Sequence, residues 1–180
     1  MKVTETRLPG VKIIDPLVFS DSRGCFYESF NQQRFDQLVQ KDVTFVQDNH
    51  SVSTKGVIRG LHYQISPFSQ GKLVRVVSGA VFDVVVDIRP DSKSFGKWVG
   101  VELNGENNLQ VWIPEGYAHG FQVVSDSAVF LYKTTNFYSP EHERCIRWDD
   151  PDLAIEWPSQ DGAVVSDKDR SGVWISELAL

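Results

Sequence analysis

Residues 80–88 read AVFDVVVDI, and this segment says most about the fold class. Alternate residues of an extended chain point to opposite sides. Here one side is wholly apolar, and the other alternates valine with aspartate. We therefore expect a strand with one face in a core and one mixed face, on which Asp83 and Asp87 are solvated. The alternative is that Asp83 faces the interior of a barrel and orients a cation there.

Further segments rich in Val, Ile, Phe and Tyr occur along most of the chain. They are too short and too rich in β-branched residues to be helices. The segments between them contain the Gly, Pro, Asn and Asp residues typical of chain reversals. Many short strands joined by tight turns predict an antiparallel sandwich or barrel, a mainly β protein. The other predicted strands are 11–14, 25–30, 43–47, 57–65, 72–77, 97–103, 109–113, 121–125 and 128–135.

One helix is predicted over residues 31–40, NQQRFDQLVQ. Asn31 is a suitable N-cap, and Phe35, Leu38 and Val39 follow at helical spacing. We expect this helix to contribute packing and no chemistry. After residue 136 the chain is rich in Pro, Trp and Asp without periodicity, so we expect it to wrap an outer surface or cover a pocket mouth. Because linkers, repeats and low-complexity tracts are missing, we expect a single domain over residues 1–180.

The composition excludes several classes of protein. The chain has 180 residues, enough to bury a core without disulfides. With 24 acidic residues against 18 Lys and Arg, the net charge is −6, which argues against binding to nucleic acid or to an anionic membrane. Cys25 and Cys145 are too few for a disulfide framework and predict free thiols. Since neither a membrane-spanning segment nor a signal peptide is recognisable, we expect a cytoplasmic protein.

Two of the four histidines lie in strand-rich segments beside turn residues. His119 ends the pattern Pro114, Gly116, His119, which resembles the PxGxxH motif of the cupin superfamily. Metal-binding cupins also use a pair of histidines spaced HxH. Here His62 is followed two residues later by Gln64, which leaves at most two good ligands. We therefore predict that no metal is bound and that side chains alone carry the chemistry.

A closer resemblance covers nearly the whole chain in order. The chain resembles the dTDP-4-dehydrorhamnose 3,5-epimerase family, whose members are cupin-type jelly rolls, in the segments RGLHYQ (59–64), QGKLVRVVSGAVFDVVVDIRPDSKSFGKW (70–98), WIPEGYAHGFQV (112–123), YKTTNFYSPEHE (132–143), IRWDDPDLAIEWP (146–158) and SDKD (166–169). The resemblance implies inversion of carbons 3 and 5 of a dTDP-linked 4-keto-6-deoxy sugar. It implies no cofactor, which agrees with the absence of a GxGxxG fingerprint. It also implies a homodimer.

The resemblance assigns roles to four residues. His62 is the general base, and Asp169 orients its imidazole, with Asp167 as the second choice. Lys72 stabilises the enolate and contacts the substrate, and Tyr132 is the general acid. Epimerisation beside a carbonyl needs these parts: a base, an oxyanion stabiliser, and an acid on the opposite face.

The resemblance also assigns the binding of the nucleotide. Arg23 and Arg59 contact the diphosphate, because a guanidinium captures phosphate oxygens with two hydrogen bonds. His119 binds near the sugar or the phosphates, and Tyr138 stacks on thymine. Further positions aligned with substrate contacts are Glu28, Gln47, Asn49, Glu143 and Lys168.

Several functions stay open at this stage. A related enzyme that inverts carbon 5 alone, or a 3,4-ketoisomerase built on the same barrel, would carry much of the same residue set. A non-catalytic cupin that binds a sugar nucleotide belongs to a different class. The presence of His62, Lys72, Tyr132 and Asp169 together favours an epimerase. This set does not separate single from double inversion, because that outcome depends on small differences in how the sugar is positioned.

Overall fold

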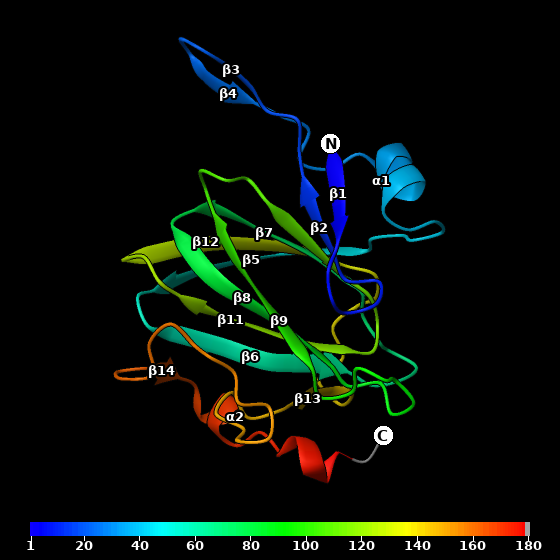
Figure 1. Cartoon of the computed structure of the whole chain (residues 1–180), viewed down its shortest axis with the longest axis vertical. Helices are drawn as coiled ribbons and strands as arrows, with labels where there is room; N and C mark the ends of the chain where they lie inside the picture. The colour runs from blue at the N-terminus through cyan, green and yellow to red at the C-terminus, as the bar shows by residue number, and fades with distance from the viewer. Residues whose placement is uncertain (179–180) are drawn as a thin grey trace.

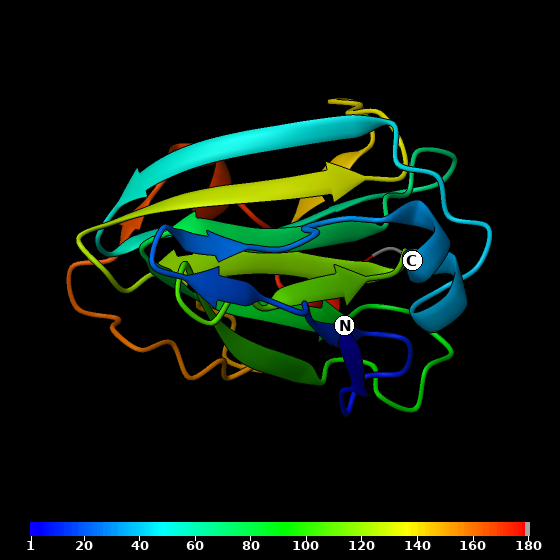
Figure 2. The ribbon, with the colours of Figure 1, turned by 90° about the horizontal axis from the view of Figure 1, so that it is seen from above.

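The computed structural model describes residues 1–178, most of which form two antiparallel sheets stacked face to face (Figure 1, Figure 2). The first sheet has the order β1 (Lys2–Glu5), β2 (Lys12–Asp15), β10 (Gln110–Ile113), β7 (Lys72–Ser78), β12 (Ser127–Thr134) and β5 (Gln47–Thr54). The second has the order β13 (Glu143–Cys145), β6 (Val57–Gln64), β11 (Tyr117–Val123), β8 (Ala80–Asp87) and β9 (Trp98–Asn104), and β14 (Val164–Val165) pairs in parallel with β6. The prediction of a mainly β, jelly-roll sandwich is confirmed.

The remaining elements lie outside the two sheets. β3 (Phe19–Asp21) and β4 (Gly24–Phe26) form a hairpin that projects from the body of the molecule (Figure 1). The helices are α1 (Gln32–Leu38), α2 (Asp167–Arg170) and a 3-10 turn (Ile175–Glu177). None of the helices in residues 1–178 has the length and apolar character that crossing a membrane requires.

The predicted helix is confirmed, with a shorter span. The Asn31 side chain caps α1 by accepting a hydrogen bond from the Arg34 N–H. Phe35 and Val39 are buried against β2, β7 and β10, while Leu38 is about half exposed. The helix therefore covers one end of the first sheet with a narrower apolar stripe than its sequence predicts.

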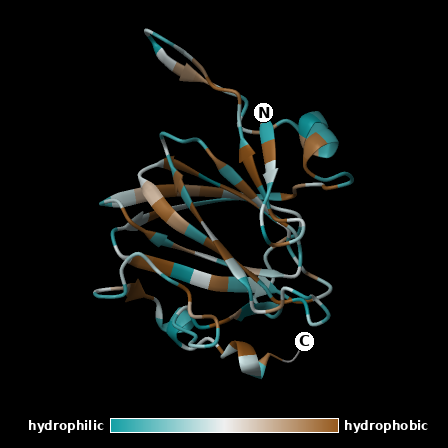
Figure 3. Ribbon diagram, viewed as in Figure 1, coloured by the Kyte–Doolittle hydropathy of each residue, from teal (hydrophilic) through white to brown (hydrophobic). Residues whose placement is uncertain are grey.

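Hydrophobic side chains fill three separate regions. Figure 3 colours the ribbon by hydropathy and shows hydrophobic residues along the strands of both sheets. The central core lies between the two sheets. A second core lies on the outer face of the second sheet, where the C-terminal segment contributes Ile146, Leu153, Ile155, Trp157, Val165 and Ile175. The expectation that this segment wraps an outer surface agrees with this arrangement.

Both faces of β8 are buried, so the prediction that Asp83 and Asp87 are solvated is wrong. Val84 and Val86 face the second core because the C-terminal segment covers that side. Asp83 lies on the face that packs between the sheets, where His119 partners it. Asp87 is satisfied by hydrogen bonds from the following loop, donated by Arg89, Ser92 and Ser94.

Two strand boundaries differ from the prediction in ways that matter for the site. β5 covers residues 47–54 in place of 43–47, because its sequence QDNHSVST alternates in exposure without alternating in hydrophobicity. β11 begins at Tyr117 in place of residue 121, so His119 lies within a strand and not in a turn. Strands β1, β13 and β14 are too short or too polar to stand out in the sequence.

Candidate active site

A cavity of about 310 Å³ opens between the two sheets. Strands β5, β7 and β12 form the wall from the first sheet, and β6, β11 and β13 form the wall from the second. Most of the predicted site residues line it, whereas Gln47, Lys168 and Asp169 hold lining residues from behind. The lining residues are Asn49, His50, Ser51, Arg59, His62, Tyr63, Gln64, Gln70, Lys72, His119, Phe121, Phe130, Tyr132, Tyr138 and Glu143.

His62 and Asp169 form a dyad across more than a hundred residues of sequence. The Nε2 atom of His62 lies 2.7 Å from Oδ1 of Asp169, which is almost fully buried. The Gly60 N–H donates to the second carboxylate oxygen at 3.2 Å. Ser166 caps α2 by accepting from the Asp169 N–H, which fixes the direction of the carboxylate. Asp167 is exposed, so the structure places Asp169 and not Asp167 against the histidine.

The protonation of the dyad follows from its surroundings. Burial raises the pKa of Asp169, but the hydrogen bond and charge of His62, with the Gly60 N–H, outweigh burial and hold the pKa below its ordinary value. The carboxylate is therefore ionised at neutral pH, and Nε2 of His62 donates to it. This leaves Nδ1 as the nitrogen that can accept a proton.

Lys72 begins β7 and lines the same cavity, with 7% of its surface exposed. Burial lowers the pKa of Lys72 to about 8, and the charge of Glu143 opposes this shift. No carboxylate of residues 1–178 forms a salt bridge with it. An ammonium group held in this way can stabilise negative charge on a substrate oxygen.

Tyr132 lies on β12, opposite Asn49 of β5 in the sheet register. Burial raises the pKa of Tyr132, the charge of Glu143 raises it further, and Arg59 opposes the shift. The phenol therefore keeps its proton at neutral pH and can donate it.

A cluster of polar side chains lies at the mouth of the cavity. Glu143 accepts a hydrogen bond from the Tyr138 hydroxyl at 2.7 Å and forms an ion pair with Lys168. Burial raises the pKa of Glu143, but the hydrogen bonds from Lys168 and Tyr138 outweigh it and lower the pKa. Gln47 accepts from the Tyr138 N–H and donates to Asn49. The Tyr138 ring, half exposed, is thus held at both its backbone and its hydroxyl.

Gln64 organises the loop that carries Tyr138. Its side-chain amide donates to the carbonyls of Phe68 and Phe137 at 2.6 and 3.1 Å and accepts from the Ser139 N–H at 2.8 Å. The residue is buried, with 7% of its surface exposed. In the sequence, Gln64 stands where metal-binding cupins have the second histidine of the HxH pair. In the structure, its side chain instead holds the backbone of residues 68, 137 and 139.

His119 lies opposite His62 in the register of β11 and β6. Its Nε2 atom is 2.7 Å from Oδ2 of Asp83, which is fully buried. Oδ1 of Asp83 has no hydrogen-bond partner within residues 1–178. His119 of the cavity wall therefore forms a second histidine–aspartate pair, and Asp83 takes the inward orientation that the sequence left as the alternative.

The predicted phosphate ligands separate in the structure. Arg59 lies at the exposed rim of the cavity, where its Nε donates to Ser53. Arg23 lies at the turn of the projecting hairpin, with 88% of its side chain exposed and paired with Asp21. Glu28 lines a different pocket. The structure of one chain does not bring Arg23 and Glu28 to the cavity.

Sequence reasoning missed several lining residues. Phe121 and Phe130 lie two positions from His119 and Tyr132 on the same strands, and this alternation could have indicated them. His50 and Ser51 were missed because β5 was not recognised. Cys145 on β13 lies opposite His62 on β6. Burial, together with the nearby charge of Asp169, raises the pKa of the Cys145 thiol to about 12.

A jelly-roll sandwich whose interior holds a histidine–aspartate dyad, a buried lysine and a protonated tyrosine defines an isomerase of the carbohydrate epimerase class. The sequence model of the dTDP-4-dehydrorhamnose 3,5-epimerase family matches residues 5–177. The chain belongs to this family.

Individual relatives agree with this assignment. The dTDP-4-dehydrorhamnose 3,5-epimerase of Shigella flexneri is 60% identical over 172 residues, which cover 96% of this chain and 94% of the relative. The enzyme of Legionella pneumophila, solved in complex with dTDP-4-keto-L-rhamnose, is 50% identical with a TM-score of 0.95, covering 98% of this chain and 94% of that chain. ChmJ of Streptomyces bikiniensis, a 3'-monoepimerase solved with dTDP-quinovose, is 34% identical with a TM-score of 0.90, covering 95% and 86%.

Proposed function

We propose that this protein converts dTDP-4-dehydro-6-deoxy-D-glucose to dTDP-4-dehydro-β-L-rhamnose, a step of dTDP-L-rhamnose biosynthesis, by inverting carbons 3 and 5. The observation that carries the proposal is the His62–Asp169 dyad in one cavity with Lys72 and Tyr132. The product complex of the Legionella relative supports the same substrate class. The match over residues 5–177 supports a single epimerase domain.

The proposed chemistry assigns one step to each side chain. Nδ1 of His62 removes the proton next to the ketone, while Asp169 stabilises the imidazolium that forms. Lys72 stabilises the enolate oxygen. Tyr132 returns a proton to the other face of the carbon. His62 belongs to the second sheet and Tyr132 to the first, so a sugar ring between the sheets would meet the base and the acid on opposite faces.

The nucleotide would extend toward the mouth of the cavity. Tyr138 presents a half-exposed ring there, which suits stacking on thymine. Arg59 supplies donors for the diphosphate, and His119 lies near the sugar or the phosphates. Glu143 and Lys168 flank the same opening, with Gln47 and Asn49 behind Tyr138.

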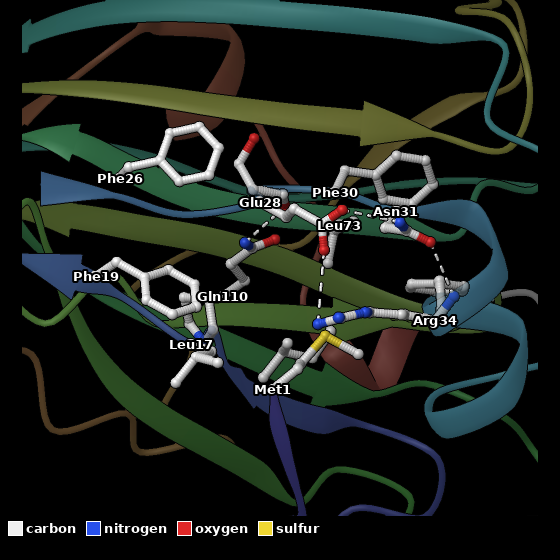
Figure 4. Close-up of a pocket in the computed structure, with 14 residues that line it drawn as sticks. Met1, Leu17, Phe19, Phe26, Glu28, Phe30, Asn31, Arg34, Leu73 and Gln110 are labelled. Atoms are coloured by element: carbon white, nitrogen blue, oxygen red, sulfur yellow. Dashed lines mark hydrogen bonds and ion pairs between the residues drawn. The ribbon is translucent and has the colours of Figure 1, made fainter.

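A homodimer would account for the two predicted ligands that lie outside the cavity. Arg23 sits on the hairpin of β3 and β4, which projects from the body and exposes Phe19 and Phe26 by 59% and 70%. These rings line an apolar pocket of about 330 Å³, in which the Glu28 side chain points toward Arg34 (Figure 4). Covering these rings with a second copy would bury apolar surface. It would also carry Arg23 and Glu28 toward the partner's nucleotide.

The free thiols of Cys25 and Cys145 support our further proposal that the enzyme acts in the cytoplasm.

The second candidate function is single inversion, at carbon 3 or carbon 5. It is favoured by the likeness to the Streptomyces 3'-monoepimerase, which has the same fold. The higher identity to enzymes named as 3,5-epimerases favours the double inversion.

The test uses the purified protein and the 4-keto sugar nucleotide alone. Proton NMR coupling constants of the product sugar report the configuration at carbons 3 and 5. We expect the L-lyxo product, and we expect His62→Ala to bind dTDP in calorimetry without forming it. A product inverted at only one carbon would establish the second candidate, and unchanged substrate would contradict both.

A further inference from the structure

Three side chains of types that can bind a metal ion meet beside the cavity, and His62 is one of them. Cys145 on β13 lies directly opposite His62 on β6, so both side chains project from the same face of the sheet. Asp169 approaches the same point from α2, beside β6 (Figure 1). One ligand atom from each residue, Sγ, a ring nitrogen and a carboxylate oxygen, all lie within 4.8 Å of one another.

The spacing of these atoms suits a soft divalent cation. Nε2 of His62 is 2.7 Å and Sγ of Cys145 is 4.0 Å from Oδ1 of Asp169. In a tetrahedral zinc site with bonds of about 2.0–2.3 Å, neighbouring ligand atoms are roughly 3.3–3.8 Å apart. These two distances lie on either side of this range, and the His62–Cys145 pair is within 4.8 Å, so small side-chain movements would complete three ligands and water can supply the fourth.

We propose that His62, Cys145 and Asp169 form a binding site for Zn²⁺ and chemically similar ions, and that occupation of this site switches off the epimerase. Thiolate, imidazole and carboxylate together select such ions over Mg²⁺ and Ca²⁺, which prefer oxygen ligands. The site is distinct from the histidine set of metal-binding cupins, because it uses a cysteine and an aspartate from the C-terminal segment. The binding site is inferred from the positions of the three side chains alone, whereas the inhibition rests on the proposed role of His62.

The loss of activity follows from the position of one proton. In the free dyad the neutral imidazole carries its proton on Nε2 and donates a hydrogen bond to the ionised Asp169. A cation bound at Nε2 displaces that proton to Nδ1, and the thiol proton of Cys145 leaves to solvent as the metal–sulfur bond forms. Both ring nitrogens are then occupied, so His62 cannot accept a proton from the substrate.

The binding test uses Co²⁺ as a spectroscopic probe in place of Zn²⁺. Cobalt–thiolate bonds give a charge-transfer absorption, and we expect this band in the wild-type protein and its loss in Cys145→Ser. The Cys25→Ser variant is the matched control, since the sequence contains only these two cysteines, and it should keep the band. A missing band in the wild type, or a band that persists in Cys145→Ser, would overturn the proposal.

The activity test measures epimerisation during a Zn²⁺ titration. We expect strong inhibition of the wild type and recovery on adding a chelator. For Cys145→Ser, which keeps the whole proposed catalytic set, we expect the Zn²⁺ concentration at half-inhibition to be at least about tenfold higher. Equal inhibition of both proteins would contradict the site. If the protein without metal shows no epimerisation, the proposed function fails, while the cobalt band still decides the binding site.

Discussion

At the scale of single residues, His62 and His119 of the candidate site are each paired with an aspartate from a different element. Asp169 of α2 fixes the tautomer of His62 on β6, and Asp83 of β8 holds His119 on β11. The resemblance to the family points to His62 and Asp169, and the structure brings them to 2.7 Å. The sequence offers the inward orientation of Asp83 only as an alternative, because alternation alone does not show that both faces of a strand are covered.

Asp169→Asn tests the tautomer argument. An amide can donate a hydrogen bond to Nε2 of His62, which would move the proton to Nδ1 and remove the basic nitrogen. We expect a fall in kcat of about 1,000-fold with dTDP affinity nearly unchanged, measured by turnover and by calorimetry. A loss below tenfold would contradict the role of Asp169.

Lys72→Met tests the cost of burying an ammonium group. Burial lowers the pKa of Lys72 from 10.5 to about 8. Between these values the unfolded chain binds more protons, so the free energy of unfolding rises with pH across this window. Below about pH 8 the full cost, roughly 3 kcal/mol, is present.

Methionine has a similar shape without the charge. We therefore expect Lys72→Met to be more stable than the wild type in urea unfolding at pH 7, and to have lost most of its epimerase activity. The stability gain should shrink as the pH approaches 10.5. A variant that is both active and less stable would show that the lysine serves packing and not the enolate.

At the scale of elements, the sequence predicts the long apolar strands and α1. The prediction misses elements whose polar residues serve the site and therefore show no hydrophobic periodicity. β5 is polar because alternate residues face the cavity or solvent, so it lacks the strand pattern. α2 has four residues, too few for any helical period, so its Ser166 cap is a weak local signal. Both elements carry residues of the proposed site.

Gln64→Met tests whether the loop that carries Tyr138 is positioned from β6. The change leaves the Ser139 N–H and two carbonyls without their side-chain partner. We expect KM for the sugar nucleotide to rise several-fold with kcat nearly unchanged.

Gln122→Met is the matched control for this change. Gln122 is a buried glutamine on β11 that bonds to both backbone groups of Ser159, a residue of the C-terminal segment. It should lose comparable stability in urea unfolding and keep its KM. Equal KM values for wild type and Gln64→Met would contradict the positioning role.

At the scale of the whole molecule, one chain leaves exposed aromatic rings on a projecting hairpin and two predicted ligands outside the cavity. Sequence alone cannot show that these rings are exposed, because their exposure depends on where the hairpin of β3 and β4 leaves the sheet. Phe26→Asp tests the proposed dimer, because a carboxylate in place of the most exposed ring would be buried at the interface.

We expect light scattering to give a dimer for the wild type and a monomer for Phe26→Asp, with unchanged circular dichroism and weaker substrate binding. Phe95→Asp, in the loop between β8 and β9, is the control and should stay dimeric. A wild-type monomer with full activity would contradict the role of the second copy.

In the proposed mechanism, the His62 dyad exchanges protons at two carbons of one sugar. Incubating the protein with dTDP-4-dehydro-6-deoxy-D-glucose in deuterated water measures this directly by NMR and mass spectrometry. We predict deuterium at carbons 3 and 5 with the wild type and at neither carbon with His62→Ala. Label at only one carbon, or label that persists in His62→Ala, would contradict this mechanism.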